Sequence, residues 1–255
     1  MSFKVIIPAR YASSRLPGKV LADVHGRPLV QWTWENACRS GAETVVIATD
    51  SDRVRAVCEA FGAQVCMTAD THDSGTERLA EVVVQLGWPE EAIVVNVQAD
   101  EPLLPPQLVE QVAAGLAADS AVPMATLCEP FASMNQVLDP NTVKVVRDCR
   151  NHAITFSRAP VPWDRGARFE RGQMQGAPLT AYRRHIGLYA YRAGFLPRYV
   201  AWPPCELERL EKLEQLRVLY HGEKILVLDA LMDAGIGVDT PDDLAALRAH
   251  LRSCG

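Results

Sequence analysis

The sequence predicts an α/β fold with a mainly parallel sheet, and three features of the chain support this prediction. In the first half, short apolar runs alternate with stretches in which apolar residues recur at helical spacing. Runs such as residues 92–97 (AIVVNV) are apolar along nearly their whole length, which is typical of strands covered by helices on both faces. A length of 255 residues and a hydrophobic fraction of 48% allow a large core. We therefore expect one domain over residues 1–255.

Strands and helices are expected in turn along the first half. The strands are predicted at residues 3–9, 43–48, 64–67 and 92–97. Pro28 opens the first helix, Asp52 is expected to cap the second, and Gly62 to end it. The next two helices are predicted from the apolar positions Leu79, Val83 and Leu86, and from Leu108, Val112 and Leu116 after a Pro-Pro pair.

The second half changes character, because its strand candidates are not separated by long helices. Strands are expected at residues 122–128, 143–147, 153–157, 185–191 and 224–229, an exposed loop at 163–178, and one helix over 207–220. Thr240 is expected to cap a final helix with Pro241 in its first turn. We expect the range of about 130–205 to form an antiparallel excursion that serves as a lid or a subunit contact.

Composition excludes several classes of protein. The 26 basic and 31 acidic residues give a formal charge of −5, which argues against a nucleic-acid or membrane-surface binder. Because the apolar runs are too short, we expect neither a signal peptide nor a membrane span. The seven cysteines are scattered and form no CxxC pair, so we expect free thiols in a reducing cytoplasm, with no zinc site.

A basic loop follows the first strand and is the first candidate site. Arg10, Arg15 and Lys19 lie in the segment RYASSRLPGK, among small residues that let a ligand approach the backbone. A loop at the carboxyl end of a first buried strand is where open α/β sheets bind ligands. The composition therefore favours a polyphosphate. The alternative is a solvated surface loop that carries three cations.

Two aspartates far apart in the sequence are the second candidate site. Asp100 follows the strand at 92–97, and Asp239 follows a later buried segment. If both lie at the same sheet edge as Arg10, they can share Mg²⁺, which prefers one or two carboxylates with substrate phosphate oxygens. The alternative is that Asp100 caps a turn and Asp239 supports the Thr240 cap.

Two further sets of polar residues are candidate binding sites. Ser74 or Thr76 can cap a helix whose free N–H groups could bind a base or a ribose, although a plain helix start is the alternative. The second set could bind a hydroxylated acid, with the arginine on its carboxylate, if its members converge. Its members are Arg158, His185, Tyr189, Glu214 and Gln215.

Eight segments, taken in order, resemble the 3-deoxy-manno-octulosonate cytidylyltransferases, also called CMP-KDO synthetases. They are residues 10–19 (RYASSRLPGK), 48–52 (ATDSD), 73–82 (DSGTERLAEV), 96–103 (NVQADEPL), 156–165 (FSRAPVPWDR), 184–196 (RHIGLYAYRAGFL), 210–217 (LEKLEQLR) and 237–244 (GVDTPDDL). Ala99 stands where the family's QGDEP segment usually has glycine. The methyl group of Ala99 could restrict how closely the backbone approaches a nucleotide.

The resemblance implies a nucleotidyltransferase fold, Rossmann-like, and a cytoplasmic homodimer. It implies transfer of CMP from CTP to the acid sugar KDO, with release of pyrophosphate, for lipopolysaccharide assembly. By motif, the triphosphate would be bound by Arg10, Arg15 and Lys19, and the base and ribose by Ser74, Thr76, Arg78 and Gln98. Mg²⁺ would be held by Asp100 and Asp239. The sugar acid would be bound by Arg158, His185, Tyr189, Glu214 and Gln215. Lys19, Arg15 and the two aspartates are the expected catalytic residues.

Three other functions are open at this point. Another CMP-sugar synthetase, such as one that uses sialic acid, shares the chemistry, although the segments 156–165 and 184–191 favour KDO. A non-catalytic nucleotide-binding regulatory protein would not need both aspartates and all three loop cations. A nicotinamide dehydrogenase is weaker still, because no GxGxxG segment follows the first strand.

Overall fold

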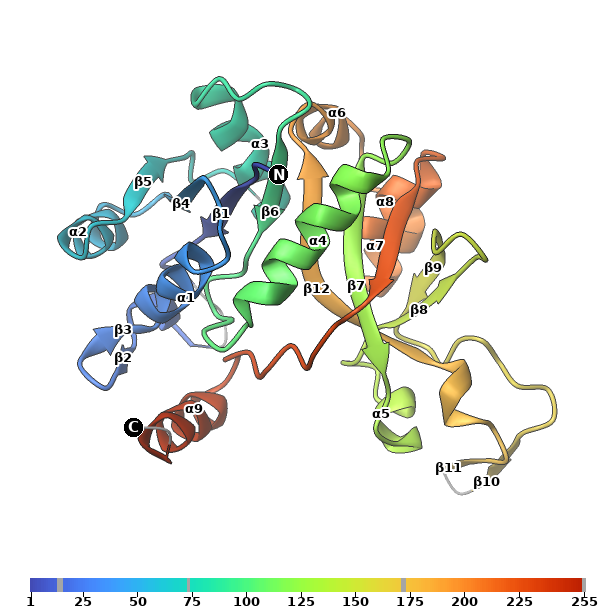
Figure 1. The fold of residues 1–255 in the computed structure, drawn as a ribbon. Coiled ribbons are helices and arrows are strands. Elements are labelled where there is room, and N and C mark those ends of the chain that lie inside the picture. The colour runs from blue at the N-terminus through green and yellow to red at the C-terminus, as the bar shows by residue number, and fades with distance from the viewer. Residues whose placement is uncertain (13–15, 73, 171–172, 254–255) are drawn as a thin grey trace.

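The computed structural model describes residues 1–12, 16–72, 74–170 and 173–253. Within them, a nine-stranded mixed sheet runs through the molecule in the order β13-β7-β12-β6-β1-β4-β5, with β8 and β9 attached through β12 (Figure 1). The strands of this sheet are β1 (Lys4–Pro8), β4 (Thr44–Thr49), β5 (Gln64–Met67), β6 (Ile93–Asn96), β7 (Met124–Pro130), β8 (Lys144–Arg147), β9 (Ala153–Ser157), β12 (Arg183–Arg192) and β13 (Ile225–Asp229).

Parallel pairing dominates the part of the sheet that the first half of the chain builds. β1 pairs in parallel with β4 and β6, so that Lys4 lies opposite both Thr44 and Val94, and β4 pairs in parallel with β5. β12 runs antiparallel between β6 and β7, with Tyr189 opposite Asn96, and β13 is parallel to β7. The prediction of a mainly parallel α/β sheet with antiparallel strands in the second half is confirmed.

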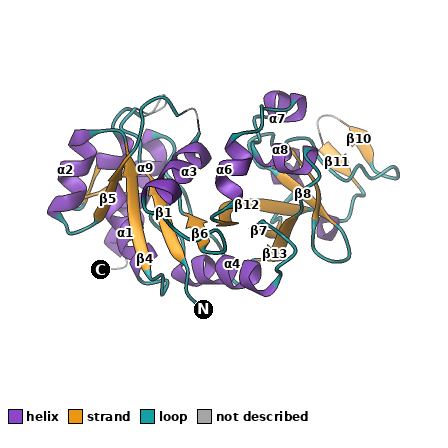
Figure 2. Cartoon of the chain, turned by 90° about the horizontal axis from the view of Figure 1, so that it is seen from above, coloured by secondary structure: helices purple, strands orange, loops and turns teal. Residues whose placement is uncertain are grey.

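Helices cover both faces of the sheet, as Figures 1 and 2 show. One apolar layer joins β1 and β6 to α1 and α4, and the other joins the opposite face to α3, α6 and α8. A third, smaller cluster packs α9 against the start of α1 and the hairpin of β2 (Asp23–Val24) and β3 (Arg27–Pro28). The helices are α1 (Leu29–Cys38), α2 (Asp52–Ala60), α3 (Gly75–Gln85), α4 (Pro106–Ala118), α5 (Met134–Leu138), α6 (Phe195–Val200), α7 (Glu206–Glu211), α8 (Gln215–Tyr220) and α9 (Pro241–Ser253).

The single helix predicted over residues 207–220 is wrong. α7 ends at Glu211, the next residue, Lys212, has a left-handed φ of 54°, and α8 begins at Gln215. The apolar spacing suggested one continuous buried stripe, but Leu207 and Leu210 are exposed while Leu213 is buried. The break turns the chain so that α8 packs on the sheet, and it places Glu214 at the turn between the two helices.

Two local predictions also need correction. Ser51, not Asp52, caps α2, because its Oγ accepts the N–H of Val54 at 3.4 Å, and Asp52 is the first helical residue. The range 163–178, predicted as an exposed loop, contains the hairpin of β10 (Arg168–Glu170) and β11 (Gln173–Gln175). This hairpin buries Met174 against α5, an interaction between distant segments that no local apolar period indicates.

Several short elements were not predicted. They are the hairpin of β2 (Asp23–Val24) and β3 (Arg27–Pro28), the 3-10 turns Lys19–Leu21 and Leu179–Ala181, and helices α5 and α6. Each has at most six residues, too few for a helical or strand period to appear. Among the described residues, no helix is both long and apolar enough to cross a membrane.

The range of residues 130–205 contains the antiparallel strands β8, β9, β10, β11 and β12. β12 itself lies in the middle of the main sheet, between β6 and β7. The excursion is therefore joined to the sheet through one of its central strands. A role for the range as a lid or a subunit contact stays a prediction.

We predict that Gly194→Ala destabilises the fold. A Cβ at Gly194 would lie 2.8 Å from the Cβ of Glu90 and 3.2 Å from its Cα, so the turn before β6 must shift. Overpacking of this kind costs about 1–3 kcal/mol, whereas glycine to alanine at an open site with compatible dihedral angles stabilises by roughly 0.4–1 kcal/mol. Urea unfolding measures the difference.

The control is Gly187→Ala, where the added Cβ meets nothing within 4 Å. A Gly194→Ala chain at least as stable as the Gly187→Ala chain would contradict the packing argument.

Candidate active site

The candidate site lies at the carboxyl edge of β1 and β6. These strands are parallel neighbours, so Arg10, just past β1, and Asp100, just past β6, come out at the same edge. The chain returns to this edge from the far end of the sequence, where the N–H of Val238 donates to the carbonyl of Asp100 at 2.8 Å. That backbone bond brings Asp239 to the site, so the two aspartates lie close together as the sequence suggested.

Lys19 lies between the two aspartates. Its Nζ is 2.6 Å from Oδ2 of Asp100 and 3.1 Å from Oδ1 of Asp239, and its side chain is only 10% exposed. Burial lowers the pKa of Lys19, but the hydrogen bonds and charges of both carboxylates outweigh it, so the net pKa is raised above the usual 10.5. The ammonium therefore stays charged and holds the two carboxylates together.

The basic loop carries two further cations, Arg10 and Arg15. Arg10 is partly buried, and its Nη2 is a buried donor with no hydrogen-bond partner in the described part of the chain. A buried guanidinium nitrogen without an acceptor suits an anionic ligand, because leaving such a donor unpaired is costly. Arg15 lies outside the described residues.

The donor set fits a shared magnesium ion. Asp100 and Asp239 already share one cation, the Lys19 ammonium, so their oxygens converge. No group of three or more His, Cys, Asp or Glu in the described chain is arranged to hold a metal. A cation held by two carboxylates would complete its shell with substrate and water oxygens, which is the usual arrangement for Mg²⁺.

Glu101 is a residue of this edge that the sequence reasoning missed. Burial raises its pKa to about 7, and the charges of Asp100 and Asp239 add to the effect. Glu101 lies so close to Gly237 that a larger residue at position 237 would be crowded, because its Cβ would lie 3.0 Å from Oε1 of Glu101. Its carboxyl lines a cavity with Gln98 and His185. An acidic residue next to Asp100 was the available signal.

Ala99, which replaces the family's usual glycine, is buried in the apolar layer beneath α1 and α4. Its carbonyl accepts a hydrogen bond from Oγ1 of Thr33 in α1, at 3.0 Å. The methyl group is therefore part of the core that supports the loop before Asp100.

Three of the five residues predicted for a hydroxylated acid, His185, Tyr189 and Glu214, come together at one face of β12. The ring centroids of His185 and Tyr189 are 5.3 Å apart, and the charge of Glu214 contributes to the raised pKa of Tyr189. Gln215 follows Glu214 and is buried at the start of α8. Arg158 is held elsewhere, at the end of β9, where its Nε donates to the carbonyl of Glu211 at 2.6 Å and its Nη1 to that of Pro140 at 2.9 Å.

This polar group acts through hydrogen bonds more than through charge. Burial, helped by the charge of Arg184, lowers the pKa of His185 to about 3, so the imidazole is neutral at pH 7. Burial raises the pKa of Tyr189 well above 10 and also raises that of Glu214. Such groups suit hydroxyl-bearing ligands.

Asn96 lies opposite Tyr189 on β6, and its buried Oδ1 has no partner among the described residues. The sequence analysis gave Asn96 no role, although a polar residue in an apolar run was an available signal.

Thr76 links the two halves of the site. Its Oγ1 donates to Oε1 of Glu214 at 2.8 Å, which joins the first turn of α3 to the turn between α7 and α8. Tyr191 on β12 is hydrogen-bonded to the same hydroxyl. α3 and α6 pack side by side here (Figure 2). Two residues 138 positions apart thus connect the predicted nucleotide end with the predicted sugar-acid end.

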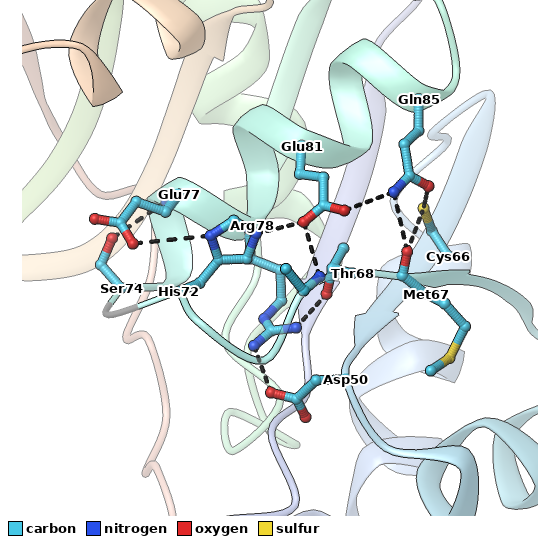
Figure 3. Close-up of polar contacts among 11 residues, drawn as sticks. Asp50, Cys66, Met67, Thr68, His72, Ser74, Glu77, Arg78, Glu81 and Gln85 are labelled. Carbon is cyan, nitrogen blue, oxygen red and sulfur yellow. Dashed lines mark hydrogen bonds and ion pairs between the residues drawn. The ribbon is translucent and has the colours of Figure 1, made fainter.

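Ser74 and Arg78 have structural contacts of their own in α3. Ser74 is the N-cap, and its Oγ accepts the N–H of Glu77 at 3.2 Å. Arg78 is fully buried, with Nη2 on Asp50 at 2.7 Å and Nη1 on Oγ1 of Thr68 (Figure 3). Arg78 thus ties α3 to the ends of β4 and β5. A contact of Ser74 or Arg78 with a nucleotide stays a prediction.

Comparison with known proteins identifies similar chains over nearly the full length. A family model described as Cytidylyltransferase matches residues 4–225. The 3-deoxy-manno-octulosonate cytidylyltransferase 1 of Hydrogenovibrio crunogenus is 60% identical over 253 residues, which cover 97% of this chain and 95% of the relative. The corresponding protein of Vibrio parahaemolyticus is 56% identical, over 98% of each chain.

A solved structure agrees with these relatives. The structure of CMP:2-keto-3-deoxy-manno-octonic acid synthetase complexed with CTP matches with a TM-score of 0.88 and 39% identity, and the match covers 100% of this chain and 99% of that one. The fold described above is therefore shared with a protein whose structure is known in complex with CTP.

We predict that His185 keeps a neutral imidazole down to about pH 4. The unfolded chain binds this proton near pH 6.5 and the folded chain only near pH 3. The neutral group therefore stabilises the fold fully above pH 6.5, and its contribution is lost as the pH falls toward 3.

NMR of chains labelled at histidine ring carbons measures the titration, with His185→Gln to assign the signal. A His185 signal that titrates near pH 6.5 in the folded chain would contradict this prediction.

Proposed function

The chain belongs to the cytidylyltransferase family, and from this premise we infer that it is an enzyme that transfers CMP from CTP to 3-deoxy-manno-octulosonate (KDO), giving CMP-KDO and pyrophosphate. The observation that carries the inference to the residues is the Lys19 ammonium between Asp100 and Asp239 at the carboxyl edge of β1 and β6. It provides positive charge for a triphosphate and paired carboxylates for a divalent cation in one place.

The reaction needs alignment and charge stabilisation more than a protein nucleophile. The anomeric hydroxyl of KDO attacks the α-phosphorus of CTP, its oxygen forms the new P–O bond, and the bond to the bridging oxygen of pyrophosphate breaks. The hydroxyl proton leaves to solvent or to a nearby base. Bringing the two substrates together in line removes much of the barrier, and stabilising the charge on the leaving group removes more.

Basic residues of the loop after β1 stabilise the leaving pyrophosphate in this proposal. Lys19 stays charged because both aspartates raise its pKa, and the buried Nη2 of Arg10, which has no partner among the described residues, can donate to a phosphate oxygen. Arg15 joins them by motif. Fixed donors directed at developing negative charge lower the barrier most in a site from which water is excluded.

We also propose Mg²⁺ as the cofactor, with Asp100 and Asp239 as its protein ligands. When bound, it would polarise the α-phosphate and help to orient the attacking hydroxyl. The convergence of the two carboxylates on one cation supports this assignment.

The sugar-acid pocket in this proposal is the polar face of β12 and the turn after α7. Neutral His185 and protonated Tyr189 can bind hydroxyl groups, and Glu214 can accept from them. Arg158, which donates to the carbonyls of Glu211 and Pro140, would have to turn toward the pocket to pair with the KDO carboxylate. The rest of the proposal is a cytoplasmic homodimer with subunit contacts in residues 130–205, and a product that feeds lipopolysaccharide assembly, as the family resemblance implies.

One assay tests the function. The purified chain is incubated with CTP, Mg²⁺ and KDO, and pyrophosphate release and CMP-KDO are followed. Parallel reactions replace KDO with N-acetylneuraminate or omit the sugar. Product with KDO alone is expected. Preference for N-acetylneuraminate would assign a different CMP-sugar synthetase, and no pyrophosphate with either acid sugar would refute the proposal.

We predict that Asp100→Asn and Asp239→Asn fold normally and lose turnover by about 10²–10³-fold, the cost of removing one transition-state contact. Amides keep the shape and remove the charge that a divalent cation needs. Steady-state turnover at saturating Mg²⁺ and circular dichroism check activity and folding.

Asp242→Asn is the matched control, because Asp242 is an exposed carboxylate in the first turn of α9, near Asp239 in sequence. The shared-metal assignment fails if either site variant matches this control in turnover.

A further inference from the structure

A polar network around His72, a residue to which no role has been assigned, joins α3 to the loop that leads into it (Figure 3). We call residues 68–72, between the end of β5 and the Ser74 cap, the approach loop. His72 is the residue of this loop that lies against the helix, with its side chain 19% exposed. Its role is not explained by packing alone, because it faces two carboxylates.

Both nitrogens of the His72 ring face α3. Nε2 contacts Oε2 of Glu81, and Nδ1 lies 3.9 Å from Oε2 of Glu77. Glu77 and Glu81 are four residues apart, so they lie on one face of the helix and would repel each other without a donor between them. With its proton on Nε2, the imidazole donates to Glu81 and fixes the end of the approach loop.

Glu81 also holds the beginning of the approach loop. Its Oε2 accepts the N–H of Ala69 at 2.9 Å, and its Oε1 accepts from Nε2 of Gln85 at 2.7 Å. Gln85 in turn donates to the carbonyl of Met67 at 3.1 Å. Burial raises the pKa of Glu81, but the hydrogen bonds from Ala69 and His72 outweigh it and lower the net pKa, so the acceptor is ionised.

Arg78 also holds the approach loop, through Thr68. Its guanidinium contacts Thr68 of the approach loop and Asp50 past β4, and the N–H of Thr68 donates to the carbonyl of Thr49 at 2.9 Å. The loop is therefore held at 68, 69 and 72 by side chains of α3. The helix cannot shift along the sheet edge without breaking several of these bonds at once.

The held part of α3 is the turn that reaches the site. Gly75 passes the end of β1, where a Cβ would lie 3.6 Å from Cγ of Pro8. Thr76 donates to Glu214 across the site at 2.8 Å. A displacement of about 1 Å is enough to break such a bond, and misplacement on this scale can cost about 10²-fold in rate.

We propose that His72 is a positioning residue for the CMP-transfer reaction: with Glu81 it fixes the approach loop on α3 and so holds Thr76 where it donates to Glu214. The proposal rests on the proposed function, because it is that reaction which needs the two ends of the site in register. His72 and Glu81 touch neither substrate in this scheme and act through Thr76.

The test compares His72→Gln with a matched control. His152 also lies between two carboxylates, with Nε2 3.5 Å from Asp119 and Nδ1 3.7 Å from Asp148, and its side chain is 12% exposed. It lies where the end of α4 meets the β8–β9 turn, away from the site. We expect His72→Gln to lower kcat/KM for CTP and for KDO about tenfold, whereas His152→Gln leaves both within twofold.

A double-mutant cycle separates positioning from a loss of stability. Thr76→Val removes the hydroxyl that His72 is proposed to hold. In a Thr76→Val background, His72→Gln should have no further effect on kcat/KM, although its effect on the urea midpoint should persist. Independent, multiplying effects on kcat/KM would overturn the proposal, and so would a His72→Gln enzyme as active as His152→Gln.

Hydrogen exchange gives a readout that does not depend on the reaction. The amides of Ala69 and Glu77, bonded to Glu81 and Ser74, should exchange at least tenfold faster in His72→Gln than in His152→Gln. Unchanged exchange would refute the proposal that His72 and Glu81 fix the approach loop on α3, even if the parent chain makes no CMP-KDO. An inactive parent chain with faster exchange refutes only the proposed function.

Discussion

The ion pair of Lys19 with Asp100 and Asp239 is the interaction on which the site depends. Two carboxylates placed side by side repel each other, and the ammonium offsets this repulsion at a partly buried edge of the sheet. The arrangement needs β1 and β6 as parallel neighbours, and it needs the backbone bond from Val238 to Asp100. The main sheet and the C-terminal segment are thus both required before any catalytic geometry exists.

The remainder of the site is built from neutral hydrogen-bonding groups that the core keeps in place. His185 and Tyr189 stay uncharged because they are buried, and Thr76 is hydrogen-bonded both to Glu214 and to Tyr191 of the same strand. In the proposed function, the charged edge would bind the triphosphate and the neutral face of β12 would bind the polyhydroxy acid, with the Thr76–Glu214 hydrogen bond between them. We propose that the network around His72 holds α3 in place for this bond.

Much of the fold could be predicted from the sequence, and the failures have a common cause. The strands at residues 64–67 and 153–157 were placed correctly to the residue, because their apolar runs end at polar or glycine-rich turns. The helix predicted over 207–220 failed because Lys212 takes a left-handed conformation that nothing in its own sequence demands. Short elements such as α5 depend on Met174 from a distant hairpin, which no local pattern contains.

The sequence by itself determined the alternation of strands and helices, the positions of the polar residues at strand ends, and the family. These follow from local apolar period and from motifs, which are properties of neighbouring residues. Only the tertiary structure decided that Lys19 reaches both aspartates, that Glu101 is partly buried near them, and that Arg78 binds Asp50 and Thr68. The physical reason is that burial and charge pairing are set by groups far apart in the chain, and their distances exist only once the sheet has formed.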